Sequence, residues 1–186
     1  MTGPKSLAAI DQLYAARGGL HYGEGVTQIE HALQCAILAE AEGSPPSLIV
    51  AALLHDIGHL LEKEEDVTQG RFDDRHEAVG ARILESIFPE SVYWPVALHV
   101  AAKRYLCFTE PQYWAGLSAA SQQSLKLQGG PFDQAQAQAF ERAPFWQAAV
   151  QLRRFDDMGK REEISGRAFA DFLPMMRDLI VMVTKA

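Results

Sequence analysis

Histidine and aspartate side chains are the residues of this sequence that could do chemistry. Five of the six histidines lie within or beside apolar sequence: His31, His55, His59, His76 and His99. One core histidine is usually an ordinary hydrogen-bonded residue. Five histidines in one small core need another explanation, because each buried imidazole without good partners costs about 1–3 kcal/mol of folding free energy. A metal ion removes that cost, since neutral imidazoles and carboxylates suit zinc, iron, manganese or copper.

The strongest local pattern is the run His55-Asp56-Ile57-Gly58-His59. If a helix continues through Gly58, His55 and His59 share one face because they are four residues apart. Asp56 is then offset by about 100° and still reaches an ion at the helix edge. The sequence has no Cys-x-x-Cys pair, which argues against a thiolate zinc site.

A second group of charged residues lies near the C-terminus. Arg153 precedes Asp156 by three residues, so the two lie on the same side of a helix. This arginine could meet an anionic substrate, or it could be a surface cation beside Asp156 and Asp157.

The elements that must position these residues are all predicted to be helices. Apolar residues recur at helical spacing, and alternating runs of β-branched or aromatic residues are absent, so we expect an all-α fold. Thr27 and Glu30 have the spacing of a capping box, and residues 62–74 are expected to form a surface loop. The expected helices span about residues 6–17, 27–42, 45–55, 75–88, 90–106, 112–117, 119–128, 134–142, 145–158 and 166–185.

Composition restricts the class of protein. Lys plus Arg number 17 against 24 Asp plus Glu, giving a net charge of −7, and no basic run predicts a nucleic-acid partner. The longest apolar stretch contains His55, Asp56 and His59, so we expect no membrane span of about 20 residues. No secretory signal opens the chain and it has only 2 cysteines, which predicts reduced thiols and a cytoplasmic location. We expect a single domain over residues 1–186.

The order His31, His55-Asp56 and Asp156 resembles the HD-domain superfamily, whose metal-binding pattern is H…HD…D on an all-α bundle. His76 and His99 lie between the His-Asp pair and the last aspartate. They resemble the additional histidines with which two-metal HD proteins bind their second ion. The resemblance therefore implies a dinuclear site.

A closer resemblance is to the 2-amino-1-hydroxyethylphosphonate dioxygenase group, the mixed-valence di-iron oxygenases that cleave organophosphonates. It covers most of the chain through segments 22–24, 28–34, 54–59, 75–77, 99–105, 118–130 and 153–157. It implies that His31, His55, Asp56 and Asp156 hold one iron. It further implies that Asp56 bridges to a second iron held by His76 and His99.

The same resemblance suggests the substrate contacts. His59, Lys103 and Ser121 would contact the phosphonate, and Arg153 could meet its charge. Lys103 follows His99 by four residues, so a helix would present its ammonium beside the metal. Tyr22 and Glu24 resemble the mobile pair that covers the site before substrate enters, although their loop is one residue shorter here.

The implied reaction uses two iron ions, Fe(II) and Fe(III), with O2 as co-substrate. The substrate would be a small organophosphonate, a 1-hydroxy-2-(amino or trimethylammonio)ethylphosphonate, cleaved at its C–P bond to glycine or glycine betaine plus phosphate. One alternative is an HD-type phosphohydrolase that attacks a nucleotide or small phosphomonoester with metal-bound water. Another is a binding module without catalysis.

Overall fold

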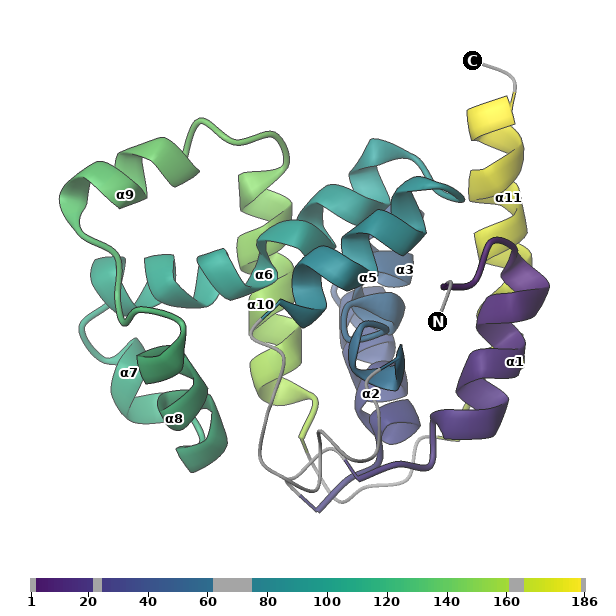
Figure 1. Cartoon of the computed structure of the whole chain (residues 1–186), viewed down its shortest axis with the longest axis horizontal. Helices are drawn as coiled ribbons and strands as arrows, with labels where there is room; N and C mark the ends of the chain where they lie inside the picture. The colour runs from purple at the N-terminus through teal and green to yellow at the C-terminus, as the bar shows by residue number, and fades with distance from the viewer. Residues whose placement is uncertain (1–2, 22–24, 62–74, 161–165, 185–186) are drawn as a thin grey trace.

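The computed structural model describes residues 3–21, 25–61, 75–160 and 166–184 (Figure 1). These residues form helices and no strand, as the sequence predicts. The elements are α1 (Leu7–Arg17), α2 (Gln28–Ala41), α3 (Pro46–Leu54), η1 (His59–Leu61), α5 (His76–Glu85), α6 (Glu90–Thr109), α7 (Tyr113–Gly116), α8 (Ala119–Leu127), α9 (Gln134–Phe140), α10 (Trp146–Met158), η2 (Phe169–Phe172) and α11 (Leu173–Thr184). Among the described helices, none has the length and apolar content needed to cross a membrane.

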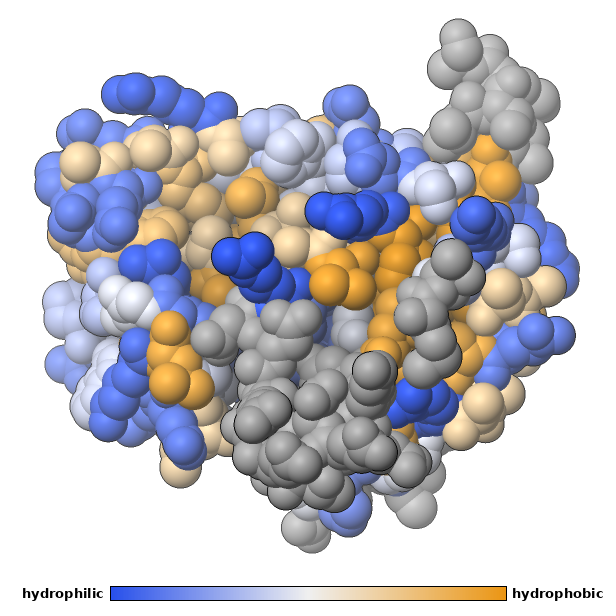
Figure 2. All heavy atoms as spheres, viewed as in Figure 1, coloured by the Kyte–Doolittle hydropathy of each residue, from blue (hydrophilic) through white to orange (hydrophobic). Residues whose placement is uncertain are grey.

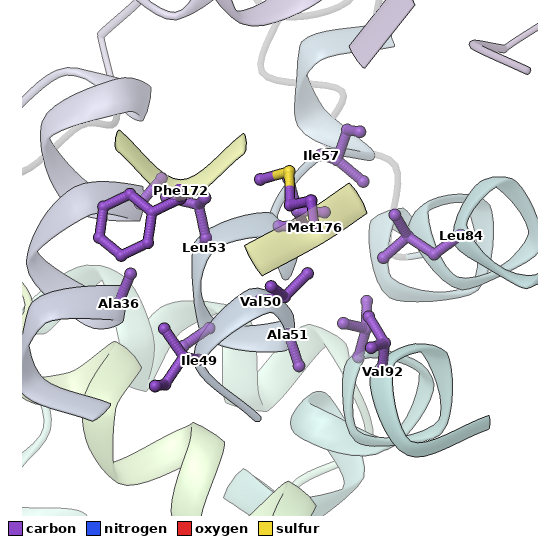
Figure 3. Close-up of a cluster of buried hydrophobic side chains, with 14 of the residues drawn as sticks. Ala36, Ile49, Val50, Ala51, Leu53, Ile57, Leu84, Val92, Phe172 and Met176 are labelled. Atoms are coloured by element: carbon purple, nitrogen blue, oxygen red, sulfur yellow. The ribbon is translucent and has the colours of Figure 1, made fainter. Parts of the chain in front are cut away.

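Helix α3 is the centre of the hydrophobic core. Every residue from Leu48 to Leu54 is buried, the pattern of a helix that is apolar all round. In Figure 3, its side chains meet Leu84 of α5, Val92 of α6, Phe172 of η2 and Met176 of α11. Because α3 runs through the core, the residues that follow it enter the interior of the protein.

Helix α3 ends close to the expected position, at Leu54 with His55 as its C-cap. No helix continues through Gly58, so the condition under which His55 and His59 would share one helical face is not met. Terminal carbonyls of a helix need other partners. His55 Nδ1 donates to Ala52 O (2.9 Å), the Tyr14 hydroxyl donates to Leu53 O (3.1 Å), and Ile57 N donates to Leu54 O (3.1 Å).

Gly58 lets α5 begin directly against this turn. A Cβ atom at Gly58 would lie 2.1 Å from the carbonyl oxygen of His76, the first residue of α5. A side chain therefore does not fit unless α5 shifts. The close approach brings His76 to the residues at the end of α3.

Helices α6 and α10 complete the frame around the site. They pack against one another, and both contact α3. Helix α6 continues to Thr109, beyond the expected end near Leu106. Helices α7, α8 and α9 lie together at one side of Figure 1, whereas α1 and α11 lie side by side at the other.

Two helix boundaries have clear causes. The capping box of α2 forms as predicted, with Glu30 accepting from Thr27 N (2.7 Å) and Thr27 Oγ1 accepting from Glu30 N (3.3 Å). The single helix expected over 166–185 is instead η2 followed by α11. Pro174 explains the break, because proline lacks an N–H and fits only the first turn of a helix.

The surface view in Figure 2 shows mostly blue polar residues at the periphery, with orange apolar residues gathered near α5. Val79 of α5 is one of the large apolar side chains that are exposed. Single exposed apolar residues are common on soluble domains and need no special explanation.

Candidate metal centre

Four imidazole rings lie in two pairs near the end of α3. The first histidine pair is His31 of α2 and His55, whose Nε2 atoms lie 3.2 Å apart. The second histidine pair is His76 of α5 and His99 of α6, whose Nε2 atoms also lie 3.2 Å apart. His31, His55 and His99 are buried, as their apolar sequence surroundings predict.

Backbone carbonyls orient three of these rings. Nδ1 of His31 lies 2.7 Å from Gly159 O, Nδ1 of His55 lies 2.9 Å from Ala52 O, and Nδ1 of His99 lies 2.7 Å from Val96 O. A carbonyl only accepts, so each Nδ1 donates and a neutral ring carries its lone pair on Nε2. In the first pair both lone pairs face one another and repel, so that pair needs a shared cation, a proton or a metal ion.

The carboxylate of Asp56 lies between the two pairs. Its Oδ2 is 3.3 Å from His55 Nε2 and 3.7 Å from His31 Nε2. Its Oδ1 is 3.5 Å from His76 Nε2 and 3.7 Å from His99 Nε2. Each oxygen thus serves a different histidine pair, which is the arrangement of a carboxylate that bridges two cations.

Asp156 of α10 completes the first group. Its Oδ1 lies 3.5 Å from His31 Nε2, while its Oδ2 accepts a hydrogen bond from Arg153 Nη1 (2.6 Å). Burial disfavours the Asp156 carboxylate, but Arg153 and then Lys160 outweigh burial and hold its pKa well below the ordinary value. Asp156 therefore presents one ionised oxygen to the first pair.

The pKa values favour a metal over protons at the second pair. Burial is the main cause that lowers the pKa of His76 well below its ordinary value. Burial and then His55 lower the pKa of His99 to about 4. Burial also opposes the charged form of His55, but Asp56 and Asp156 raise its pKa to about 9. The second pair thus stays unprotonated at neutral pH, as metal ligands must.

The donor set therefore fits two metal ions. By the distances above, His31 and His55 form one group with Asp56 Oδ2 and Asp156 Oδ1. His76 and His99 form the other group with Asp56 Oδ1, and Cys35 also lies close enough to His31 and His55 to share an ion with them. Nitrogen and carboxylate donors suit first-row metals. Cys35 Sγ also lies 3.7 Å from His31 Nε2, but burial and then Asp156 raise the pKa of its thiol well above the ordinary value.

Two cations, Arg153 and Lys160, lie beside Asp156, and a third, Lys103 of α6, contacts helix α8. Lys103 Nζ donates to Ser124 Oγ (2.7 Å). Arg153 Nη2 and Lys160 Nζ both lie near Ser121 Oγ, at 3.4 and 3.1 Å. Lys103, Arg153 and Ser121 are buried, so the interpretation of Arg153 as a surface cation is wrong. Burial and then Arg153 lower the pKa of Lys103 to about 8.

The remaining predicted residues have different outcomes. His59 of η1 stacks on His76 with ring centroids 4.0 Å apart, so it lies beside the second pair. Tyr22 and Glu24 lie outside the described residues. The structure thus brings the six predicted metal ligands together, with Lys103, Ser121 and Arg153 beside them.

Sequence reasoning missed several residues of this region. Ser124 follows Ser121 by three residues on α8, so helical spacing could have indicated it. Lys160 lies beyond the end of α10 at Met158, so helical spacing gave no signal for it. Tyr113 offered no such signal, because it lies on the four-residue helix α7, far along the chain from its partners Arg153 and Asp157.

Comparisons with known proteins agree with the geometry. The HD domain family model matches residues 29–127. A Leisingera caerulea protein named [1-hydroxy-2-(trimethylamino)ethyl]phosphonate dioxygenase (glycine-betaine-forming) is 43% identical over 173 residues, covering 92% of this chain and 88% of its own. A Gimesia maris protein named hydroxymethylphosphonate dioxygenase is 47% identical over 157 residues, covering 83% and 78%. An uncharacterized Acanthamoeba polyphaga mimivirus protein is 37% identical over 160 residues, covering 84% and 73%. The chain therefore belongs to the HD-domain family and is related over most of its length to phosphonate dioxygenases.

Proposed function

We propose that the protein is a di-iron dioxygenase that cleaves the C–P bond of a small 1-hydroxyalkylphosphonate. The observation that carries the proposal is Asp56, whose two oxygens face two different histidine pairs. A bridging carboxylate with three further ligands on one side and two on the other is a dinuclear set, which two-metal hydrolases also use. The relatives therefore decide between the two reactions. Both relatives with assigned activities are named as phosphonate dioxygenases.

The reaction balances without a further reductant. One hydroxyphosphonate and one O2 give one carboxylic acid and one phosphate. The C1–P and C1–H bonds break, one new C–O and one new P–O bond form, and the four electrons released reduce O2. Two iron ions, Fe(II) and Fe(III), held by the six ligands would supply the oxygen activation and redox chemistry that side chains lack.

The protein's own side chains bind and orient the substrate in this proposal. Lys103 and Arg153 would neutralise the phosphonate, and the Ser121 hydroxyl would donate a hydrogen bond to it. These groups are buried, so their charges act in a medium of lower dielectric than water. His59, stacked on His76, would contact the phosphonate beside the second pair.

The substituent on C1 separates the candidate substrates. A hydrogen gives hydroxymethylphosphonate, which yields formate, and an aminomethyl or trimethylammoniomethyl group yields glycine or glycine betaine. We propose an amino or trimethylammonio substrate. The Leisingera caerulea relative is named for the trimethylamino compound, and the Gimesia maris relative for hydroxymethylphosphonate.

The test measures O2 uptake and phosphate release together, using protein shown to hold two irons per chain. The substrates are 2-amino-1-hydroxyethylphosphonate, its trimethylammonio analogue and hydroxymethylphosphonate. We expect one O2 consumed per phosphate released. 2-Aminoethylphosphonate, which lacks the C1 oxygen, is the matched negative control.

Two results would reject the dioxygenase. One is no O2 uptake with any hydroxyphosphonate despite full iron content. The other is phosphate release from a phosphomonoester or nucleotide under nitrogen, which would support a metal-dependent phosphohydrolase. Tight metal binding with no turnover in either assay would support a binding module.

A further inference from the structure

Arg153 is surrounded by acceptors on every nitrogen. Nη1 donates to Asp156 Oδ2 (2.6 Å), Nε donates to the Tyr113 hydroxyl oxygen (3.2 Å), and Nη2 donates to Asp157 Oδ1 and lies 3.4 Å from Ser121 Oγ. One guanidinium therefore connects a candidate metal ligand to a candidate substrate contact. Its orientation decides where both of them point.

Tyr113 and Asp157 close a ring of hydrogen bonds with this arginine. The Tyr113 hydroxyl donates to Asp157 Oδ2 and accepts from Arg153 Nε, while Asp157 Oδ1 accepts from Arg153 Nη2. Burial is the main cause that raises the pKa of Tyr113, so the phenol keeps the proton that it donates. A closed ring of charge-assisted bonds fixes a planar guanidinium in one orientation.

The ring leaves Asp156 with one oxygen for the first histidine pair. Arg153 Nη1 occupies Asp156 Oδ2, and Oδ1 faces His31 Nε2 at 3.5 Å. If Arg153 turned away, Asp156 could rotate and lose this one-oxygen arrangement. Hydrogen bonds to a metal ligand commonly determine its orientation and its affinity for the metal.

Helix α7 holds Tyr113 at this position from outside the core. Gln122 of α8 donates to Trp114 O and Leu117 O, at 3.3 and 3.1 Å, which ties α7 to the helix that carries Ser121. Arg154 of α10 pairs with Glu110, just before α7. Helix α7 is therefore anchored to both helices whose residues it orients.

We propose that Tyr113 and Asp157 are positioning residues that act through Arg153 to aim Asp156 at its metal ion. The inference rests on the proposed ligand set, but it concerns metal affinity and needs no particular substrate. Neither residue contacts the histidine pairs in the hydrogen bonds that define the ring. In this proposal, they orient Asp156 through the guanidinium of Arg153.

The test is Tyr113→Phe, which removes one hydroxyl from the ring. Tyr105→Phe is the matched control, because the Tyr105 hydroxyl also donates to a carboxylate, Glu141 Oε1 (2.7 Å), away from the site. Metal affinity is measured anaerobically with Fe(II), by competition against a chromophoric chelator. We expect Tyr113→Phe to lower the affinity for the ion bound by Asp156 by about 10–100-fold. Tyr105→Phe should change neither ion.

Asp157→Asn provides a second approach if Tyr113→Phe folds poorly. It keeps the shape of the side chain but removes the charge that holds Arg153 Nη2, so one ion should again bind more weakly. The double variant should lose little more than the more damaging single variant, because the ring acts as a unit. Metal affinities equal to those of Tyr105→Phe in both single variants would overturn the proposal.

The measurement is independent of turnover. If no hydroxyphosphonate is oxidised but Tyr113→Phe still weakens one ion, the proposed function fails and the positioning role stands. If turnover occurs and neither single variant differs from Tyr105→Phe in metal affinity, the positioning role fails and the proposed function stands.

Discussion

Asp56 is the residue on which both candidate metal positions depend. Its two oxygens face different histidine pairs, at 3.3 Å from His55 Nε2 and 3.5 Å from His76 Nε2. Asp56→Asn keeps the shape but replaces one oxygen with an NH2 group, which cannot bind a cation. We expect metal content to fall from two ions per chain to one or none, with at least a 100-fold loss of oxygenase activity. Elemental analysis and O2 uptake measure the two effects.

Asp178→Asn makes the same chemical change at an exposed position of α11 and is its control. Two firmly bound ions in Asp56→Asn would contradict the bridging role. Activity loss with two ions retained would instead limit Asp56 to a function in turnover.

The lowered pKa of Lys103 predicts that substrate binding depends on pH. Burial and then Arg153 lower its pKa to about 8, so the ammonium that would bind phosphonate is present below pH 8 and lost as the pH rises through it. We expect the KM of the hydroxyphosphonate to rise by up to about 10-fold per pH unit above that value. Steady-state kinetics between pH 6.5 and 9.5 measure it.

Lys103→Arg should flatten this KM profile, because arginine keeps its charge throughout the range. Lys126→Arg, at an exposed position of α8, should leave the wild-type profile unchanged. A wild-type KM that is constant to pH 9.5 would remove Lys103 from the phosphonate contacts.

Gly58 shows how one element depends on the close approach of another. A methyl group at this position meets the His76 carbonyl oxygen at 2.1 Å, so α5 must move. We expect Gly58→Ala to cost about 1–3 kcal/mol of unfolding free energy. It should also displace His76 and release the ion of the second pair, which denaturant unfolding and metal analysis measure separately.

Gly19→Ala is the control for this prediction, because a Cβ atom there meets nothing within 4 Å. Gly58→Ala with two ions and unchanged stability would show that α5 can shift without cost.

Helical elements were predictable from sequence wherever local signals define them. The Thr27–Glu30 box and the apolar run of α3 are examples, because capping and burial depend on neighbouring residues. The close contact between Gly58 and His76 was not predictable, because the two residues lie on opposite sides of residues 62–74 in the sequence. The six metal ligands could be predicted because their order matches a known sequence pattern. The hydrogen-bond ring of Tyr113, Arg153 and Asp157 matches no such pattern and was found only in the structure.

At the scale of the whole molecule, the candidate centre joins helices that are far apart in sequence. Its ligands come from α2, the end of α3, α5, α6 and α10, so each element of the frame contributes one side chain or a neighbouring pair. Without metal, burying these polar groups costs desolvation free energy, which the packing of the core around α3 must offset. Metal binding should therefore stabilise the whole fold and not only the site.

Metal removal tests this coupling between site and fold. A ligand that binds only the folded state at 100 times its Kd adds about 2.7 kcal/mol of stability, and 1 kcal/mol shifts the Tm of a chain of this size by about 2–4 °C. We expect chelation to lower the Tm by at least 5 °C in calorimetry, and re-addition of Fe(II) under nitrogen to restore it. Asp56→Asn should show a smaller shift, because it retains fewer ions. An identical Tm before and after complete metal removal would mean that the helices position these six ligands without any contribution from the metal.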